Sequence, residues 1–170
     1  MRSRIADSAS RAIVRHTDAG LVVAFPRTNN AACWVADLDA LTVDVPGVGA
    51  VHRGFWGAWQ AIAAPVTAAG AQPVTRVGHS LGAAIAILAA VSLKLTGLPP
   101  AAVYGFGPPR VSPDLGVRTL LARVPVHLYR NGLDVVTDLP PDWHHAALLT
   151  HIGAPALPIV NIEDHQIACY

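Results

Sequence analysis

The sequence has few charged side chains for its 170 residues, and neither sign of charge dominates. Asp, Glu, Lys and Arg make up 14% of the chain, against roughly 25% in an average soluble domain. Twelve basic and eleven acidic residues leave a formal net charge of +1, so no broad basic surface for nucleic acid or an anionic membrane is expected. A hydrophobic fraction of 52% also excludes an intrinsically disordered chain, because disorder requires low hydrophobicity.

Cysteine is scarce, and the two that are present, Cys33 and Cys169, lie far apart. Without a C-x-x-C pair, zinc-ribbon and thioredoxin-like redox sites are excluded. A disulfide between the two stays open, because sequence does not supply the geometry that a bridge needs. No signal peptide is visible, since residues 1–17 interleave arginines with small residues and form no apolar core. The cellular compartment and the oligomeric state are left open.

The sequence also lacks a convincing membrane span. The nearest approach is the stretch 77–93, seventeen residues between Arg76 and Lys94, whereas a spanning helix needs about 20 predominantly apolar residues. This stretch also begins with a glycine-rich turn. We therefore expect a buried central helix that starts near Leu81, and no transmembrane segment.

Short apolar runs alternate with helical patterns along the chain, as in proteins built from a sheet and crossover helices. The runs at 21–25, 74–77, 101–106 and 126–129 predict β-strands, and proline or glycine follows each within three residues. Because their apolar residues are consecutive, we expect strands buried on both faces, in a mostly parallel sheet with helices on both sides. Residues 41–51 predict a further strand pair or hairpin.

Two segments have helical periodicity. One face of residues 54–69 is formed by Phe55, Trp59, Ile62 and Val66, and Pro65 is expected to kink or shorten that helix. Residues 3–15 are also expected to be helical. After Asn131 the chain is rich in Pro, His and Gly, which is typical of loops that hold functional residues. No linker or repeat divides the chain, so one domain over residues 1–170 is expected.

The most specific signal for chemistry is the pentapeptide 78–82, Gly-His-Ser-Leu-Gly, which follows a predicted strand and precedes a helix. That context is typical of a nucleophile elbow. Glycines flank the serine because so sharp a turn is crowded. The turn presents the Ser80 hydroxyl and leaves the amide of Leu81 at a helix N-terminus, where it can stabilise an oxyanion. A glycine-rich turn with a helix-capping serine is the alternative.

A serine nucleophile requires a base and an acid that orients the base, and after such an elbow they follow in the order Ser, Asp or Glu, His. Asp134 emerges after the last predicted strand, at the edge where the nucleophile is expected. Asp138 is its main rival, with a turn or capping role as the alternative. His165, in the final loop, is the candidate base. Adjacent His144 and His145 lack the spacing of metal ligands, so no zinc site is expected.

Several segments between Val22 and His165 resemble the class 3 lipases, the fungal-lipase-like branch of the α/β-hydrolases. They are V-H-R-G-F at 51–55, the elbow and its helix at 77–88, Y-G-F-G-P-P-R-V at 104–111, N-G-L-D-V-V-T-D-L-P-P at 131–141, H-I-G at 151–153 and D-H at 164–165. The resemblance implies a compact three-layer α/β-hydrolase fold. It also implies a catalytic triad of Ser80, Asp134 and His165, and so favours Asp134 over Asp138.

The same resemblance implies an oxyanion hole formed by Thr28 and the amide of Leu81. Thr28 matches the hydroxyl residue of the family's F-R-G-[ST] segment, and Arg27 stands where that segment has a glycine. Residues 29–35 match the position of the family's lid and imply a short one. Trp34 is then either a rim contact for the acyl chain or a packed core residue.

Two further residues near the predicted site, His79 and Tyr170, are aromatic. His79, beside the nucleophile, is a candidate substrate contact, with a structural role as the alternative. Tyr170 stands five residues after His165, where family members often have a tyrosine after three.

The resemblance and the motifs together predict a lipase or esterase that works through an acyl-enzyme on Ser80. No cofactor or metal is needed. The expected partner is a small-molecule or lipid ester, with transient contact to a lipid interface and none to nucleic acid. Two alternatives remain open: another acyl hydrolase on this fold, such as a cutinase-like enzyme, a phospholipase or a thioesterase, or a non-catalytic binding protein, which Arg27 suggests.

Overall fold

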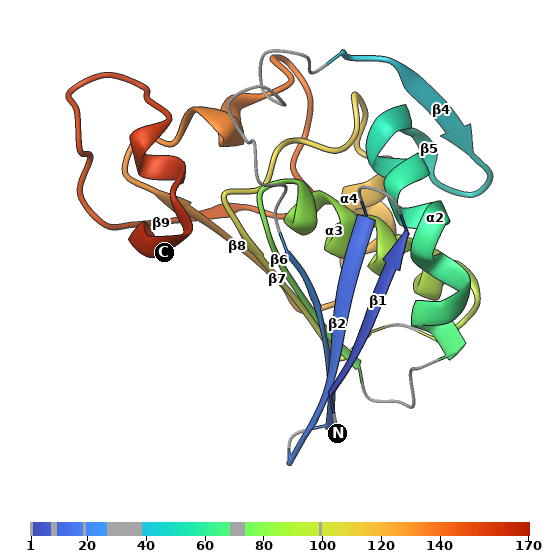
Figure 1. Ribbon diagram of the computed structural model, residues 1–170. Coiled ribbons are helices and arrows are strands. Elements are labelled where there is room, and N and C mark those ends of the chain that lie inside the picture. The colour runs from blue at the N-terminus through green and yellow to red at the C-terminus, as the bar shows by residue number, and fades with distance from the viewer. Residues whose placement is uncertain (1, 8–9, 19, 27–38, 69–73, 99) are drawn as a thin grey trace.

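The computed structural model describes residues 2–7, 10–18, 20–26, 39–68, 74–98 and 100–170. At its centre lies a seven-stranded sheet in the order β1-β2-β3-β6-β7-β8-β9 (Figure 1). The strands are β1 (Arg2–Asp7), β2 (Ser10–Thr17), β3 (Gly20–Phe25), β6 (Val74–His79), β7 (Ala102–Phe106), β8 (Val126–Asn131) and β9 (Leu149–Ile152). From β3 to β9 neighbouring strands are parallel, which confirms the predicted mostly parallel sheet.

The N-terminal segment is a β-hairpin, so the predicted helix over residues 3–15 is wrong. β1 pairs antiparallel with β2, and β2 with β3. Ala12 and Val14 are buried while Arg11 and Arg15 are exposed, which is the two-residue alternation of a half-buried strand. The few apolar residues of this segment fit both the 3.6-residue repeat of a helix and the two-residue repeat of a strand. Pairing with β3 supplies the backbone hydrogen bonds that decide between them.

The α-helices of the described chain lie together on one side of the sheet (Figure 1). α2 (Arg53–Ala68) packs on β1 and β2, and α3 (Leu81–Leu95) packs on α2, β3, β6 and β7. A short α4 (Gly116–Leu120) contacts α3. A separate two-stranded hairpin, β4 (Thr42–Val45) with β5 (Gly49–His52), confirms the strand pair predicted at 41–51.

Burial alternates along β3 and β7, and along β6 as far as Gly78. In β3, Leu21, Val23 and Phe25 are buried against the helices, whereas Val22 and Ala24 are only half-buried on the other face. The expectation of helices on both faces is therefore met on one face within the described part of the chain. Consecutive apolar residues do not distinguish a sheet covered on both faces from a sheet covered on one, because a half-covered face still favours β-branched and small apolar side chains.

α3 is the buried central helix that the sequence predicts. All of its residues from Leu81 to Val91 are buried, and so is Leu93. Several are alanine or glycine, which lets the helix axis approach the sheet closely. Among the described residues, no helix has the length and hydropathy needed to cross a membrane.

α2 presents the predicted apolar face to the core, since Phe55, Trp59, Ile62 and Val66 are its buried residues. The helix continues through Pro65 to Ala68, so the proline does not end it. Proline leaves the carbonyl four residues earlier without its helical donor. That carbonyl belongs to Ala61, which is exposed, so water can supply the missing hydrogen bond.

A buried arginine gives a prediction about stability. Arg76 on β6 is 1% exposed, its guanidinium lies 5.9 Å from the centre of the Trp59 ring, and burial lowers its pKa to about 10. Within the described residues no carboxylate pairs with it. Because a buried charge without a partner opposes folding, Arg76→Met should raise the free energy of unfolding by about 1–3 kcal/mol. Urea denaturation measures this change.

Arg123→Met, at an exposed position, is the matched control and should change stability by less than about 0.5 kcal/mol. A clear loss of stability in Arg76→Met, absent from the control, would show that the buried guanidinium stabilises the fold.

Candidate active site

Ser80 sits in a strained turn between β6 and α3. Its φ of 58° and ψ of −130° lie in a region that non-glycine residues rarely adopt. The Ser80 amide donates to the carbonyl of Phe106, 3.0 Å away, and its carbonyl accepts from the amide of Ala83 at 2.9 Å. These two bonds hold the turn between the end of β7 and the first turn of α3. Backbone strain of this kind is found at functional sites.

The two glycines of the elbow are required by close backbone contacts. A Cβ on Gly78 would collide with the backbone of Gly82 and Ala83, and one on Gly82 would collide with the carbonyl of Phe25. The crowding that the sequence suggested is therefore present on both sides of Ser80. A side chain at either position would force β3, β6 and α3 apart.

A buried histidine–carboxylate pair lies beyond the ends of β7 and β8. His165, 2% exposed, places Nδ1 at 2.8 Å from Oδ2 of Asp134, which is 0% exposed. A carboxylate oxygen accepts, so Nδ1 carries the proton and Nε2 presents a lone pair. Among the described residues neither His165 Nε2 nor Ser80 Oγ has a hydrogen-bond partner.

Gly107 connects the serine turn with this pair. It follows Phe106, whose carbonyl accepts from the Ser80 amide. A Cβ on Gly107 would lie 2.7 Å from Asp134 Oδ2 and 2.8 Å from His165 Nδ1. The His165 ring and the Asp134 carboxylate thus rest against the backbone that immediately follows the residue holding Ser80.

Tyr170 binds the same carboxylate from the other side. Its hydroxyl donates to Asp134 Oδ2 and accepts from the amide of Asn131 at 3.1 Å. Burial, and then the charge of Asp134, raise the pKa of Tyr170 above its ordinary value, so the phenol stays protonated and remains a donor. The other carboxylate oxygen of Asp134 accepts from the amide of Val136 at 2.8 Å.

Two loops that are distant in sequence are held together by Asp164, the neighbour of His165. Its buried carboxylate accepts from the amide of Leu133 at 2.8 Å, from the amide of Ala156 at 2.9 Å and from the side chain of Asn161 at 3.0 Å. Burial alone would raise the pKa of Asp164, but these hydrogen bonds outweigh it and lower the pKa. The loop of Asp134 is thereby fixed to the loop of His165.

Asp164→Asn should therefore lower the free energy of unfolding by about 2–4 kcal/mol at pH 7, because an amide N–H replaces an acceptor that faces buried donors. A depressed pKa means that the stabilisation is complete above the pKa of an unfolded aspartate, about 3.9, and is lost as pH falls through the folded value. The difference between parent and variant should shrink below about pH 4. Urea denaturation at pH 7 and in the acid range measures both.

The exposed neighbour Glu163, whose side chain bonds only to Gln166 in the described chain, supplies the control. Glu163→Gln should leave stability almost unchanged at both pH values. An Asp164→Asn effect that does not vary with pH would contradict the charge-based explanation.

The rival acid and the other predicted residues lie elsewhere. Asp138 forms a bidentate ion pair with Arg130 at 3.1 and 3.0 Å, and a longer one of 3.6 Å with Arg110. His145 Nε2 donates to the carbonyl of Thr137 at 2.8 Å, and burial lowers the pKa of His145 to about 4. Of the described residues, no group of three or more His, Cys, Asp or Glu side chains is placed to hold a metal ion.

His79 packs against the histidine–carboxylate pair. Its Nε2 lies 2.9 Å from the carbonyl of His165, and its ring stacks on the His165 ring with centroids 4.7 Å apart. Leu81 begins α3, where the first amides have no acceptor inside the helix. The predicted residues Arg27, Thr28, Cys33 and Trp34 lie outside the described residues.

Sequence reasoning did not assign Tyr170, Gly107 or the three residues Asn131, Asn161 and Asp164. Their roles depend on contacts between distant loops. Two features of the sequence indicate two of these residues. Gly107 directly follows the strand that ends at Phe106, and Tyr170 lies near the candidate histidine.

Comparisons with known proteins show which family and relatives the chain resembles. Residues 22–144 match the model of the family described as Lipase (class 3). Secreted mono- and diacylglycerol lipase A of Penicillium cyclopium is 32% identical over 179 residues, which cover 97% of this chain. Secreted mono- and diacylglycerol lipase 1 of Fusarium solani is 33% identical over 133 residues, or 71% of this chain. The chain spans 58% of the length of the first relative and 39% of the second.

Solved structures show the same fold. The triacylglyceride lipase of Rhizomucor miehei superposes with a TM-score of 0.78 at 21% identity, over 96% of this chain and 79% of that one. A variant of MDLA from Penicillium cyclopium gives a TM-score of 0.74 at 27% identity, over 96% of this chain and 67% of that one. The architecture is that of the α/β-hydrolases, as the sequence predicts.

Proposed function

Because the chain belongs to the class 3 lipase family, we propose that it is a serine carboxylic ester hydrolase that cleaves acylglycerols or other acyl esters. The observation that supports this most directly is the buried pair of His165 and Asp134, with Nδ1 and Oδ2 2.8 Å apart. It lies beside the backbone that holds Ser80 in a strained conformation.

In the proposed mechanism Ser80 Oγ attacks the ester carbonyl carbon while His165 Nε2 removes the hydroxyl proton. The tetrahedral oxyanion receives a hydrogen bond from the Leu81 amide and, as the family resemblance suggests, from Thr28. His165 then donates its proton to the leaving alkoxide, and the C–O bond of the ester breaks to leave an acyl-enzyme. Water, deprotonated by the same nitrogen, attacks the acyl carbon. The bond from that carbon to Ser80 Oγ then breaks, His165 returns the proton to Oγ, and the carboxylic acid leaves.

Asp134 supports both proton transfers without accepting a proton itself. It fixes the His165 tautomer that leaves Nε2 free, and its negative charge stabilises the imidazolium that forms. The carboxylate is buried and, among the described residues, accepts hydrogen bonds from Val136, His165 and Tyr170. Its orientation is thus set before substrate binds.

A fluorophosphonate probe tests this function. We expect it to label the parent chain at Ser80, and we expect the parent to hydrolyse p-nitrophenyl butyrate. Ser80→Ala should lose both properties while keeping its circular dichroism spectrum. If the folded parent is not labelled and has no esterase activity, the chain is the non-catalytic binding protein instead.

The substrate's physical state gives a further prediction. Residues 29–35 offer one large apolar side chain, Trp34, and two asparagines, too little for an amphipathic helix of several turns that could close over the site. We therefore expect tributyrin to be hydrolysed below its solubility limit. Initial rates measured across that limit check this: negligible activity beneath it and a sharp jump above it would indicate a working lid.

A further inference from the structure

One face of the central sheet carries no long helix within the described chain. α2 and α3 both pack on the opposite face. On the uncovered face Ile13, Val22, Ala24, Val77 and Tyr104 are half-buried. This face lies opposite the layer formed by α3, and at its end His79 and Phe106 contact the rings of His165 and Tyr170.

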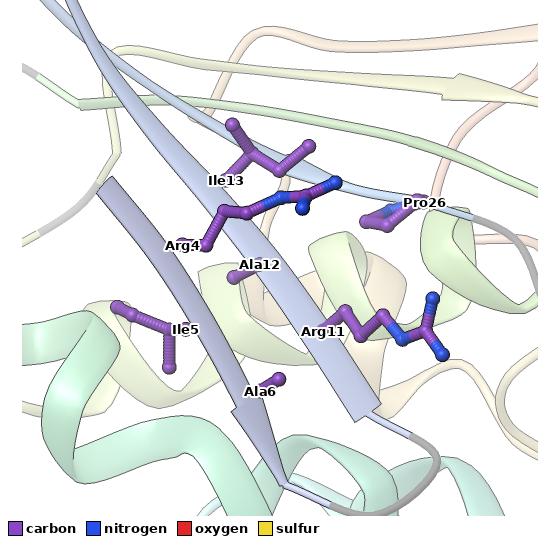
Figure 2. A pocket seen from close by; sticks show the side chains of 7 residues that line it. All are labelled: Arg4, Ile5, Ala6, Arg11, Ala12, Ile13 and Pro26. Carbon is purple, nitrogen blue, oxygen red and sulfur yellow. The ribbon is translucent and has the colours of Figure 1, made fainter. Parts of the chain in front are cut away.

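Arginines gather at one side of this face. The hairpin register pairs Arg4 with Ile13 and Arg11 with Ala6, and it sets Arg15 opposite Val22 of β3. Arg4, Arg11 and Arg15 are exposed, and in the described chain none of them forms an ion pair. Figure 2 shows Arg4 and Arg11 on the same face of the hairpin as Ile13, in a hollow of about 440 Å³ that Pro26 also lines.

On the described part of this face no carboxylate balances these cations. Along the described strands, every second residue points to this face, and none of those positions is Asp or Glu. The net charge of +1 for the whole chain therefore conceals a local basic cluster. Exposed guanidinium groups without internal partners are available to bind an anion, and their planar geometry suits a carboxylate.

An apolar row leads away from the arginines across the sheet. The strand register places Arg4, Ile13, Ala24, Val77 and Tyr104 side by side on five neighbouring strands. With strands about 4.8 Å apart, the row from Arg4 to Tyr104 spans about 19 Å. The small side chain of Ala24 leaves space in the middle of the row. A hollow of about 390 Å³ lies along it, lined almost entirely by apolar atoms, and extends past Phe106 and Ile167 to Gly78 and His79 at the end of β6.

We propose that this face binds one long-chain fatty acid anion, with its carboxylate on Arg4 and Arg11 and its chain along the row from Ile13 to Tyr104. The length and narrowness of the row suit a single extended acyl chain, and the cations stand at one end of it only. A second copy of this protein would set arginines against a face that has no carboxylates to pair with them, so charge complementarity disfavours it. The proposal does not depend on the hydrolytic function.

Calorimetric titration tests it, with the full chain carrying Ser80→Ala so that turnover plays no part. The probe is dodecanoate below its micellar concentration, with dodecan-1-ol and acetate as controls for chain and headgroup. We expect one dodecanoate per chain. Dodecan-1-ol should bind at least about tenfold more weakly, because it lacks the charge that the guanidinium groups bind.

Variants locate the binding site. Arg4→Gln combined with Arg11→Gln should weaken dodecanoate binding about tenfold or more, whereas Arg118→Gln combined with Arg123→Gln, at exposed positions on another surface, should not. Ala24→Met, which fills the middle of the row, should weaken dodecanoate binding and leave the fold intact by circular dichroism.

Four results would overturn the proposal: no dodecanoate binding, equal affinity for dodecan-1-ol, equal weakening by the control arginine pair, or association only with anionic phospholipid vesicles. A dimer that light scattering detects, and that the Arg4 and Arg11 substitutions abolish, would also overturn it in favour of a second copy.

Discussion

Replacing Ser80 or His165 by alanine is expected to lower kcat/KM for a soluble ester by about 10⁴- to 10⁶-fold. The physical reason is that the nucleophile and the base depend on each other. Ser80→Ala leaves no nucleophile, and His165→Ala leaves the Ser80 hydroxyl without a base. Hydrolysis of p-nitrophenyl butyrate by purified, folded protein measures the loss.

The double variant distinguishes a joint mechanism from two independent effects. Because the two residues act as a unit, Ser80→Ala with His165→Ala should be little worse than either single variant. Strictly additive losses would contradict the assignment. Ser112→Ala is a matched control, since Ser112 is also buried but bonds to the carbonyl of Ala50 and to Asp114, away from the proposed site.

Asp134→Asn is expected to lower kcat/KM by about 10³- to 10⁴-fold with little change in KM. An amide at this position would donate to His165 Nδ1, which would move the proton to Nε2 and leave no base for Ser80. The same substitution replaces one of the two carboxylate oxygens, which together accept three hydrogen bonds, by an NH₂ donor. The stability of the variant must therefore be measured together with its rate.

Asp138→Asn is the control for this substitution, because it changes an aspartate in the same loop that pairs with Arg130 instead of a histidine. We expect its rate to stay near that of the parent. Its stability should fall by about 1 kcal/mol at most, because the Asp138 side chain is 38% exposed and water screens the ion pair. The reverse ranking of the two rates would move the acid to Asp138.

Several local features could be predicted because neighbouring residues alone decide them. The elbow is one, since Gly78 and Gly82 are the residues that permit a crowded strand-to-helix turn. The apolar face of α2 is another, as its spacing of Phe55, Trp59 and Ile62 is that of a helix. Prediction failed where local periodicity fits two structures, as in the N-terminal hairpin, which only pairing with β3 decides.

The sequence by itself determined the central strands β3, β6, β7 and β8, the helices α2 and α3, the turn at Ser80 and the residue types from which a triad is proposed. Only the tertiary structure decided which carboxylate meets the histidine, because Asp134 and His165 are separated by 31 positions and Asp134 and Tyr170 by 36. It also decided that three arginines share an uncovered face with an apolar row. Sterics and periodicity act between neighbours along the chain, whereas these contacts depend on strand register and on how two loops close over the same edge of the sheet.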